Sequence, residues 1–127
     1  MREKQLFEYL KKNYLPDLEL AKDRYSTWDC ISRERSLLIE LKSRSKHYDT
    51  LLIERKKFDG MAERALALGY SPLYVNSTPE GVFSFRILEI PLEWEVNHKN
   101  PSTTSFSNKA RVEKEVAYIP VSLGTKI

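Results

Sequence analysis

The chain has few of the residues on which several common protein classes depend. Among 127 residues there are one cysteine, two histidines and four glycines. A single thiol, Cys30, forms neither an internal disulfide nor a cysteine-rich zinc site, which indicates a reducing compartment. The histidines, His47 and His98, lie far apart and show no metal-ligand spacing. No Walker loop, dinucleotide-binding glycine pattern or nucleophile elbow is present, so the sequence offers no sign of these classes of enzyme.

Long apolar runs are also missing. No stretch is long enough to span a bilayer, and the charged, amphipathic N-terminus is unlike a signal peptide, so we expect a cytoplasmic protein with no membrane partner. Hydrophobic residues make up 41% and charged residues 31%, with a net charge of +3. This composition and length predict one globular domain. The mild positive charge is compatible with binding to nucleic acid but does not by itself indicate it.

Hydrophobic spacing predicts alternating helices and strands. A helix is expected over residues 2–14, ended by Pro16, and a second helix over residues 50–68, ended by Gly69 and Pro72. The second helix carries an apolar stripe that reaches Leu66. The remaining predictions are an extended segment over 18–31, a turn over 32–35, strands over 36–43, 73–75 and 82–88, a turn over 77–81, a loop over 97–108, and a strand or short helix over 112–120. This order favours an α/β domain with a mixed sheet.

The stretch SLLIELKS, residues 36–43, combines a buried-strand pattern with two charges. Apolar residues occupy both faces, as in a central strand covered on both sides. Because strand side chains alternate, Glu40 and Lys42 project to the same face. If residues 28–30 pair with this strand as a hairpin, Asp29 lies beside Glu40. Two adjacent carboxylates repel each other unless a cation lies between them, and hard oxygen ligands of this kind bind Mg²⁺. Lys42 would then orient a water molecule or neutralise a phosphate.

This arrangement resembles the PD-(D/E)XK nuclease superfamily, in which an acidic residue precedes (D/E)-x-K on the next strand. The matching residues are Asp29 and, after a step of eleven residues, Glu40-Leu41-Lys42; Trp28 stands where the motif's name has proline. The resemblance implies a restriction-endonuclease-like α/β fold, with a central mixed β-sheet flanked by helices. It covers a core of about residues 3–90 within a single domain, and leaves 91–127 as a C-terminal extension.

The same resemblance implies a Mg²⁺- or Mn²⁺-dependent nuclease that hydrolyses DNA phosphodiester bonds. Asp29 and Glu40 would hold the metal, the Leu41 carbonyl would be a further ligand, and Lys42 would position the nucleophile. An acidic residue on the first helix, Glu8 or alternatively Glu3, would complete the site. Small members of this kind resemble phage-type or Holliday-junction-resolvase-like nucleases. We therefore expect DNA as partner, a homodimer or a larger nucleic-acid-processing complex, and a phage-encoded protein that acts in the host cell.

Basic residues near these positions are candidates for contacts to the nucleic-acid backbone. Lys57, on the second predicted helix, matches a position at which family members carry a basic or amide group facing the site. The candidate contacts are Arg44, Lys46, Lys57, Lys109 and Arg111. The alternative is that these side chains form an ordinary solvated surface.

Two other interpretations stay open at the level of the sequence. The domain could be a catalytically inactive nuclease-like module that binds nucleic acid or a protein. Alternatively, Glu40 and Lys42 could form a structural ion pair while Asp29 caps a turn. A charged pair within an apolar strand is costly without a function, and the complete Asp29, Glu40 and Lys42 set favours an enzyme.

Overall fold

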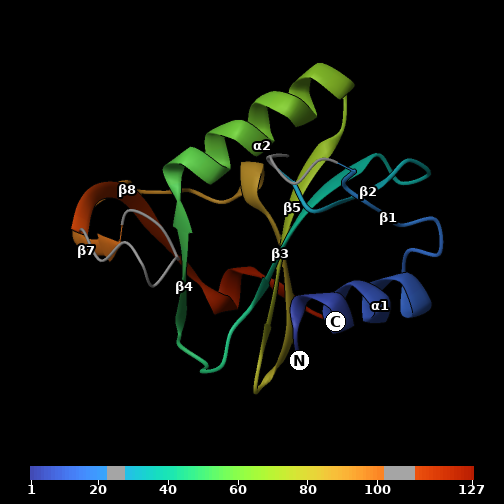
Figure 1. The fold of residues 1–127 in the computed structure, drawn as a ribbon, viewed down its shortest axis with the longest axis horizontal. Coiled ribbons are helices and arrows are strands. Elements are labelled where there is room, and N and C mark those ends of the chain that lie inside the picture. The colour runs from blue at the N-terminus through green and yellow to red at the C-terminus, as the bar shows by residue number, and fades with distance from the viewer. Residues whose placement is uncertain (23–27, 102–110) are drawn as a thin grey trace.

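The computed structural model describes residues 1–22, 28–101 and 111–127 and contains two helices and two sheets within these ranges (Figure 1). The helices are α1 (Glu3–Asn13) and α2 (Arg55–Leu68). The strands are β1 (Glu19–Leu20), β2 (Cys30–Ser32), β3 (Leu37–Ser43), β4 (Thr50–Glu54), β5 (Ser71–Thr78), β6 (Gly81–Arg86), β7 (Glu95–Pro101), β8 (Arg111–Pro120) and β9 (Thr125–Lys126). Short 3-10 turns cover Ile87–Glu89 and Val121–Leu123.

The larger sheet has the strand order β1-β2-β3-β5-β6-β9. Strand β3 runs parallel to β5 and antiparallel to β2, and the other neighbouring strands pair antiparallel. The sheet is therefore mixed, as the sequence predicted. The predicted strand over residues 36–43 is confirmed, and its pairing on both edges places it inside the sheet.

Both faces of β3 are covered, which explains its two-sided apolar pattern. Ile39 and Leu41 share one buried cluster with Leu6 and Leu10 of α1. On the opposite face, Leu38 packs in a cluster with Ala65 of α2. Figure 1 shows α1 and α2 on either side of β3. Glu40 lies on the same face as Leu38 and therefore faces α2.

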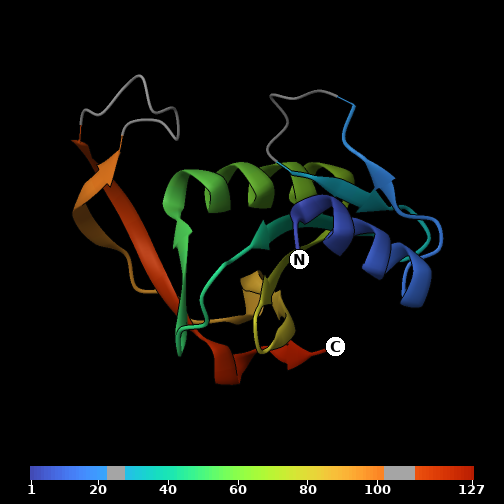
Figure 2. The same ribbon diagram turned by 60° about the horizontal axis from the view of Figure 1, so that its bottom comes forward.

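The smaller sheet, with the order β4-β8-β7, corrects two of the predicted elements. Residues 50–54 form β4 rather than the first turns of a helix, because Leu51 and Ile53 alternate and are buried where they pair with β8. The predicted loop over 97–108 begins instead as β7, and its residues 102–108 lie outside the described ranges. The segment over 112–120, left open between strand and helix, is strand β8. Figure 2 shows β7 and β8 at the end of the molecule opposite α1.

The ends of the helices largely follow the sequence signals. Helix α1 stops at Asn13, before Pro16, and α2 ends at Gly69, whose φ of 71° is the left-handed conformation that glycine adopts readily. The apolar stripe of α2 is shorter than predicted. Met61 is buried, whereas Leu66 is 83% exposed at the far end of the helix. None of the helices in the described ranges is long and apolar enough to cross a lipid bilayer.

The side chain of Arg44 connects the two sheets. Its Nε donates to the Asn76 side-chain oxygen of β5 at 2.7 Å, and its Nη2 donates to the Leu52 carbonyl of β4 at 2.7 Å and to the Tyr74 hydroxyl at 3.1 Å. The Tyr74 hydroxyl in turn donates to the Leu52 carbonyl at 3.1 Å. Arg44, predicted as a contact to nucleic acid, thus has its guanidinium bound within the protein, and we assign it a structural role.

Replacing Arg44 tests this role. We expect Arg44→Met to lower the free energy of unfolding by about 2–4 kcal/mol, because buried acceptors on β5 and a half-buried acceptor on β4 lose a charged donor. Lys46→Met, which removes an exposed charge two residues away, serves as the control and should change stability by less than about 0.5 kcal/mol. Equal urea midpoints for the two variants would contradict the assignment.

Candidate active site

The pairing of β2 with β3 brings Asp29 and Glu40 together. Cys30, which follows Asp29, lies opposite Ile39, which precedes Glu40. The Asp29 amide also donates to the Ile39 carbonyl at 2.9 Å, so the pairing becomes irregular at Asp29, and both acids line the same cavity. The hairpin predicted from the sequence is therefore confirmed, together with the neighbouring positions of these two acids.

The Asp29 carboxylate is held against β3 by a backbone hydrogen bond. Its Oδ2 accepts from the Leu41 amide at 2.7 Å. In a β-strand, the N–H and C=O groups of one residue point toward the same edge. The Leu41 carbonyl therefore points to the edge on which Asp29 lies. This direction is the one required if the carbonyl and the Asp29 carboxylate are to bind the same metal ion.

Glu40 is a buried acid with one unpaired oxygen. The residue is only 8% exposed. Its Oε1 accepts from Lys57 Nζ at 3.1 Å, whereas its Oε2 is buried and has no hydrogen-bond partner in the structure. Burial, together with the negative charge of Asp29, raises the pKa of Glu40 to about 7, although Lys57 opposes this shift. An unpaired buried carboxylate oxygen is costly to leave without a cation or a proton.

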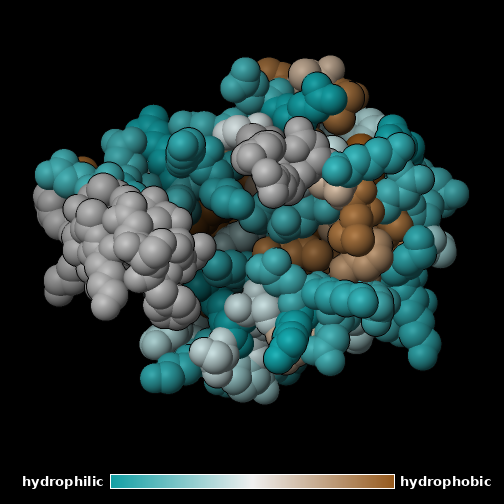
Figure 3. All heavy atoms as spheres, viewed as in Figure 1, coloured by the Kyte–Doolittle hydropathy of each residue, from teal (hydrophilic) through white to brown (hydrophobic). Residues whose placement is uncertain are grey.

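A cavity of about 180 Å³ opens over these residues. Its wall contains four carboxylates and two lysines, and this excess of negative charge favours a cation. Lys42 is exposed at the same cavity. The face of the molecule that Figure 3 shows is mostly hydrophilic, with hydrophobic residues in limited patches. The lining residues are Glu3, Asp29, Glu40, Leu41, Lys42, Leu52, Ile53, Glu54, Lys57 and Tyr74.

The acidic residue that α1 contributes to this cavity is Glu3. Glu8, which the sequence favoured, is exposed and does not line the cavity. The two residues are five positions apart, and at about 100° per residue they point from different sides of the helix. The buried side of α1 is fixed by Leu6 and Leu10, and this orientation leaves Glu8 away from β3.

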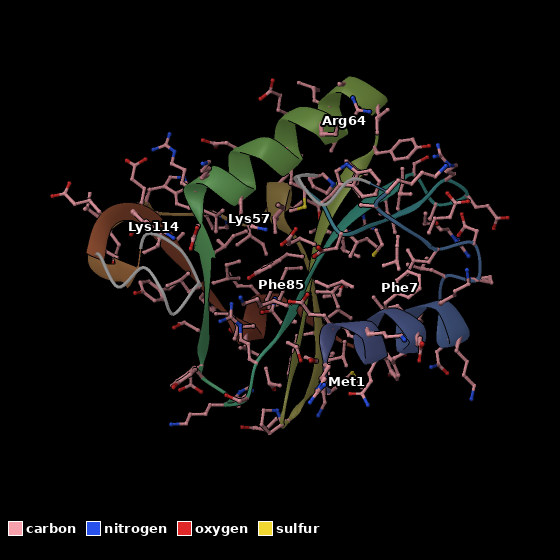
Figure 4. All side chains as sticks on the ribbon, in the orientation of Figure 1. Met1, Phe7, Lys57, Arg64, Phe85 and Lys114 are labelled. Carbon is pink, nitrogen blue, oxygen red and sulfur yellow. The ribbon has the colours of Figure 1, made fainter. Side chains whose placement is uncertain are left out.

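The predicted basic contacts fall in different places. Lys57 reaches into the cavity from the first turn of α2, and Figure 4 shows it pointing toward the middle of the molecule. Lys46 is exposed and does not line the cavity. Lys109 lies outside the described residues, and Arg111 is described only as the first backbone position of β8.

Tyr74 and Leu52 belong to the cavity wall but were missed by the sequence analysis. Tyr74 lies beside Glu40 because β5 runs parallel to β3 in that register. Burial raises the pKa of the Tyr74 hydroxyl, so this group stays a neutral hydrogen-bond donor. Periodicity identifies β5 as a strand but does not give its neighbour or its register, so no local signal placed Tyr74 at the site.

The oxygen atoms of the site fit a hard divalent cation. Within the described ranges, no three His, Cys, Asp or Glu side chains lie close enough together to form a ready-made metal cluster. Two carboxylates and a backbone carbonyl nevertheless match Mg²⁺, which proteins commonly bind through one or two carboxylates while it keeps several waters. The unpaired Oε2 of Glu40 supplies the observation that supports this fit.

Comparison with known proteins supports the fold. No family model and no curated protein sequence matches the chain. Among solved structures, it is similar to Hjc, a Holliday junction resolvase from the archaeal hyperthermophile Archaeoglobus fulgidus. The TM-score is 0.64 at 18% identity, over 98% of this chain and 95% of the resolvase. The fold is restriction-endonuclease-like, so the resemblance to PD-(D/E)XK nucleases expected from the sequence is confirmed at the level of the fold.

The raised pKa of Glu40 predicts a pH dependence of stability in EDTA. Because about 7 exceeds the ordinary value of 4.5, the folded protein favours the protonated acid. This stabilisation is complete below the ordinary value and is lost as the pH rises toward 7. Glu40→Gln cannot ionise, so its stability relative to the unchanged protein should rise over this interval by roughly 1–3 kcal/mol, measured by urea denaturation.

The exposed Glu8 offers the matched control. Glu8→Gln should follow the pH curve of the unchanged protein. If the stability of Glu40→Gln also runs parallel to that of the unchanged protein between pH 4.5 and 7, Glu40 does not titrate as its burial implies.

Proposed function

We propose that this protein is a divalent-metal-dependent nuclease that hydrolyses phosphodiester bonds of DNA. The observation that carries the proposal is the pair Asp29 and Glu40, held side by side on adjacent strands and facing a cavity that also contains Lys42. The structural similarity to a Holliday junction resolvase supports DNA, and branched DNA in particular, as the substrate. The presence of all three motif residues favours an active enzyme over an inactive binding module.

Asp29, Glu40 and the Leu41 carbonyl would hold Mg²⁺ or Mn²⁺. When bound, such an ion supplies positive charge for the scissile phosphate and acidifies water. The Leu41 amide keeps the Asp29 carboxylate in place at 2.7 Å, and the packed strand β3 keeps Glu40 in place. Positioning on rigid elements of this kind is what a hydrolytic site requires.

Lys42 has the remaining role in hydrolysis. Its exposed ammonium would orient the attacking water at the cavity and stabilise the negative charge that grows on the phosphoryl oxygens. Water adds to phosphorus, the bond to the leaving sugar oxygen breaks, and that oxygen takes up a proton. A second copy of the chain would bring a second site, which suits the two incisions that resolving a four-way junction needs.

Cleavage assays test the proposed function directly. Labelled four-way-junction, linear duplex and single-stranded DNA, and RNA, are incubated with Mg²⁺ or Mn²⁺. We expect cleavage of DNA that EDTA abolishes, and losses of at least about 100-fold in rate for Asp29→Asn, Glu40→Gln and Lys42→Met. Lys46→Met should keep most of the activity, because Lys46 does not line the cavity.

Two results would count against this function. Cleavage that persists in EDTA or in Asp29→Asn belongs to another site or to a contaminant. Tight binding of junction DNA without any cleavage in either metal would favour the inactive module instead.

The acidic residue of α1 is tested by a matched pair of variants. Glu3 lines the cavity and Glu8 does not, so Glu3→Gln should lower the cleavage rate by about 10–100-fold, the range for residues that support a metal site. Glu8→Gln should leave the rate unchanged. The reverse result would return Glu8 to the site, and equal activity in both variants would remove α1 from the chemistry.

A further inference from the structure

Lys57 and Glu40 form an unequal pair. The side chain of Lys57 is 53% exposed, whereas that of Glu40 is 10% exposed, and Nζ lies 3.1 Å from Oε1. The acid is therefore fixed in the interior, while the lysine approaches it from the solvent side. A lysine side chain has four methylene groups, so its ammonium can leave the carboxylate without moving the helix.

This ion pair explains how the acidic pair is tolerated without a metal. Asp29 and Glu40 are neighbours, and their like charges repel each other. Lys57 is the lysine hydrogen-bonded to Glu40, while the more exposed Lys42 occupies the same cavity. The other acid at this end of α2, Glu54, is already paired with Lys114 at 3.2 Å. Lys57 thus supplies the positive charge at the place where a cation would be bound.

On the basis of the proposed function, we propose that Lys57 takes the place of the divalent cation in the metal-free protein and is displaced when the metal binds. An ion held by the Glu40 carboxylate would share that group with Nζ, which lies 3.1 Å from Oε1. Two positive charges beside one buried carboxylate repel each other strongly. The ammonium therefore moves toward the cavity opening, where the phosphate backbone of DNA provides its next partner.

A merely structural ion pair predicts the opposite effect on metal binding. If Lys57 only oriented Glu40, removing it would disturb the carboxylate and weaken the metal site. If Lys57 competes with the metal, removing it frees Glu40 and strengthens the site. The direction of the change in metal affinity separates the two roles, and it is measured without reference to catalysis.

The test is a calorimetric titration of the 127-residue chain with Mn²⁺. We expect Lys57→Met to bind Mn²⁺ at least about fivefold more tightly, the effect of one unit charge at about 4 Å even at the dielectric constant of water. Lys56→Met is the control, because Lys56 is exposed and lines a different groove between α2 and β8. It should bind Mn²⁺ as the unchanged protein does.

Cleavage by Lys57→Met at saturating Mn²⁺ should nevertheless be slower, because this variant lacks the ammonium that contacts the phosphate in the unchanged protein. Lys57→Gln provides a second neutral variant that keeps a hydrogen-bond donor for Glu40, and it should also bind Mn²⁺ more tightly even if Lys57→Met folds poorly. Unchanged or weaker Mn²⁺ affinity in a folded neutral variant overturns the proposed displacement.

The outcome distinguishes this inference from the proposed function. If the unchanged protein binds no Mn²⁺ and cleaves no DNA, the metal-dependent nuclease itself is refuted. If it binds Mn²⁺ and cleaves DNA while Lys57→Gln and Lys57→Met gain no affinity, the nuclease stands and the displacement of Lys57 is refuted.

Discussion

The antiparallel register of β2 and β3 determines whether there is a site at all. With Cys30 opposite Ile39, Asp29 lies beside Glu40 and its carboxylate receives the Leu41 amide. A slip of one residue would place a different side chain beside Glu40 and send the alternating residues to the wrong faces. The register is held because Ile39 and Leu38 are buried on opposite faces, so neither can exchange its environment with a charged neighbour without a large cost.

Burial fixes the two acids and also makes their charge costly. Glu40 faces α2 within a packed sheet, and one of its oxygens has no partner in the structure. The half-exposed side chain of Lys57 offsets the cost of this buried negative charge by forming an ion pair with Glu40. A rigid anionic site with a mobile counter-charge is suited to exchanging one cation for another. The stability of the metal-free fold and the affinity of the site for a metal are therefore linked through the same carboxylate.

The sequence was most informative where one local pattern carried the structure. Alternation in β3, the hairpin before it and the cap at Gly69 were all readable, and the acidic pair followed from them. Contacts between distant parts of the chain limited the prediction in two places. Residues 50–54 were predicted as the start of the second helix but form β4; their alternation is short, and the partner β8 lies more than fifty residues away, outside any local window. The choice between Glu8, which was favoured, and Glu3, the alternative, could not be made from the sequence, because the rotation of α1 depends on how Leu6 and Leu10 pack, which is a tertiary property.

The segment after residue 90, predicted as an extension of the nuclease core, bears on the geometry of the site through β4. Strand β8 pairs with β4 along all of its five residues, and α2 begins directly where β4 ends. The position of Lys57 in the first turn of α2 therefore depends on β8 as well as on the bonds from Arg44 and Tyr74 to the Leu52 carbonyl. The structural similarity to the resolvase also spans 98% of the chain and not only residues 3–90. In so small a domain, the second sheet is what holds the start of α2 at the correct distance from β3.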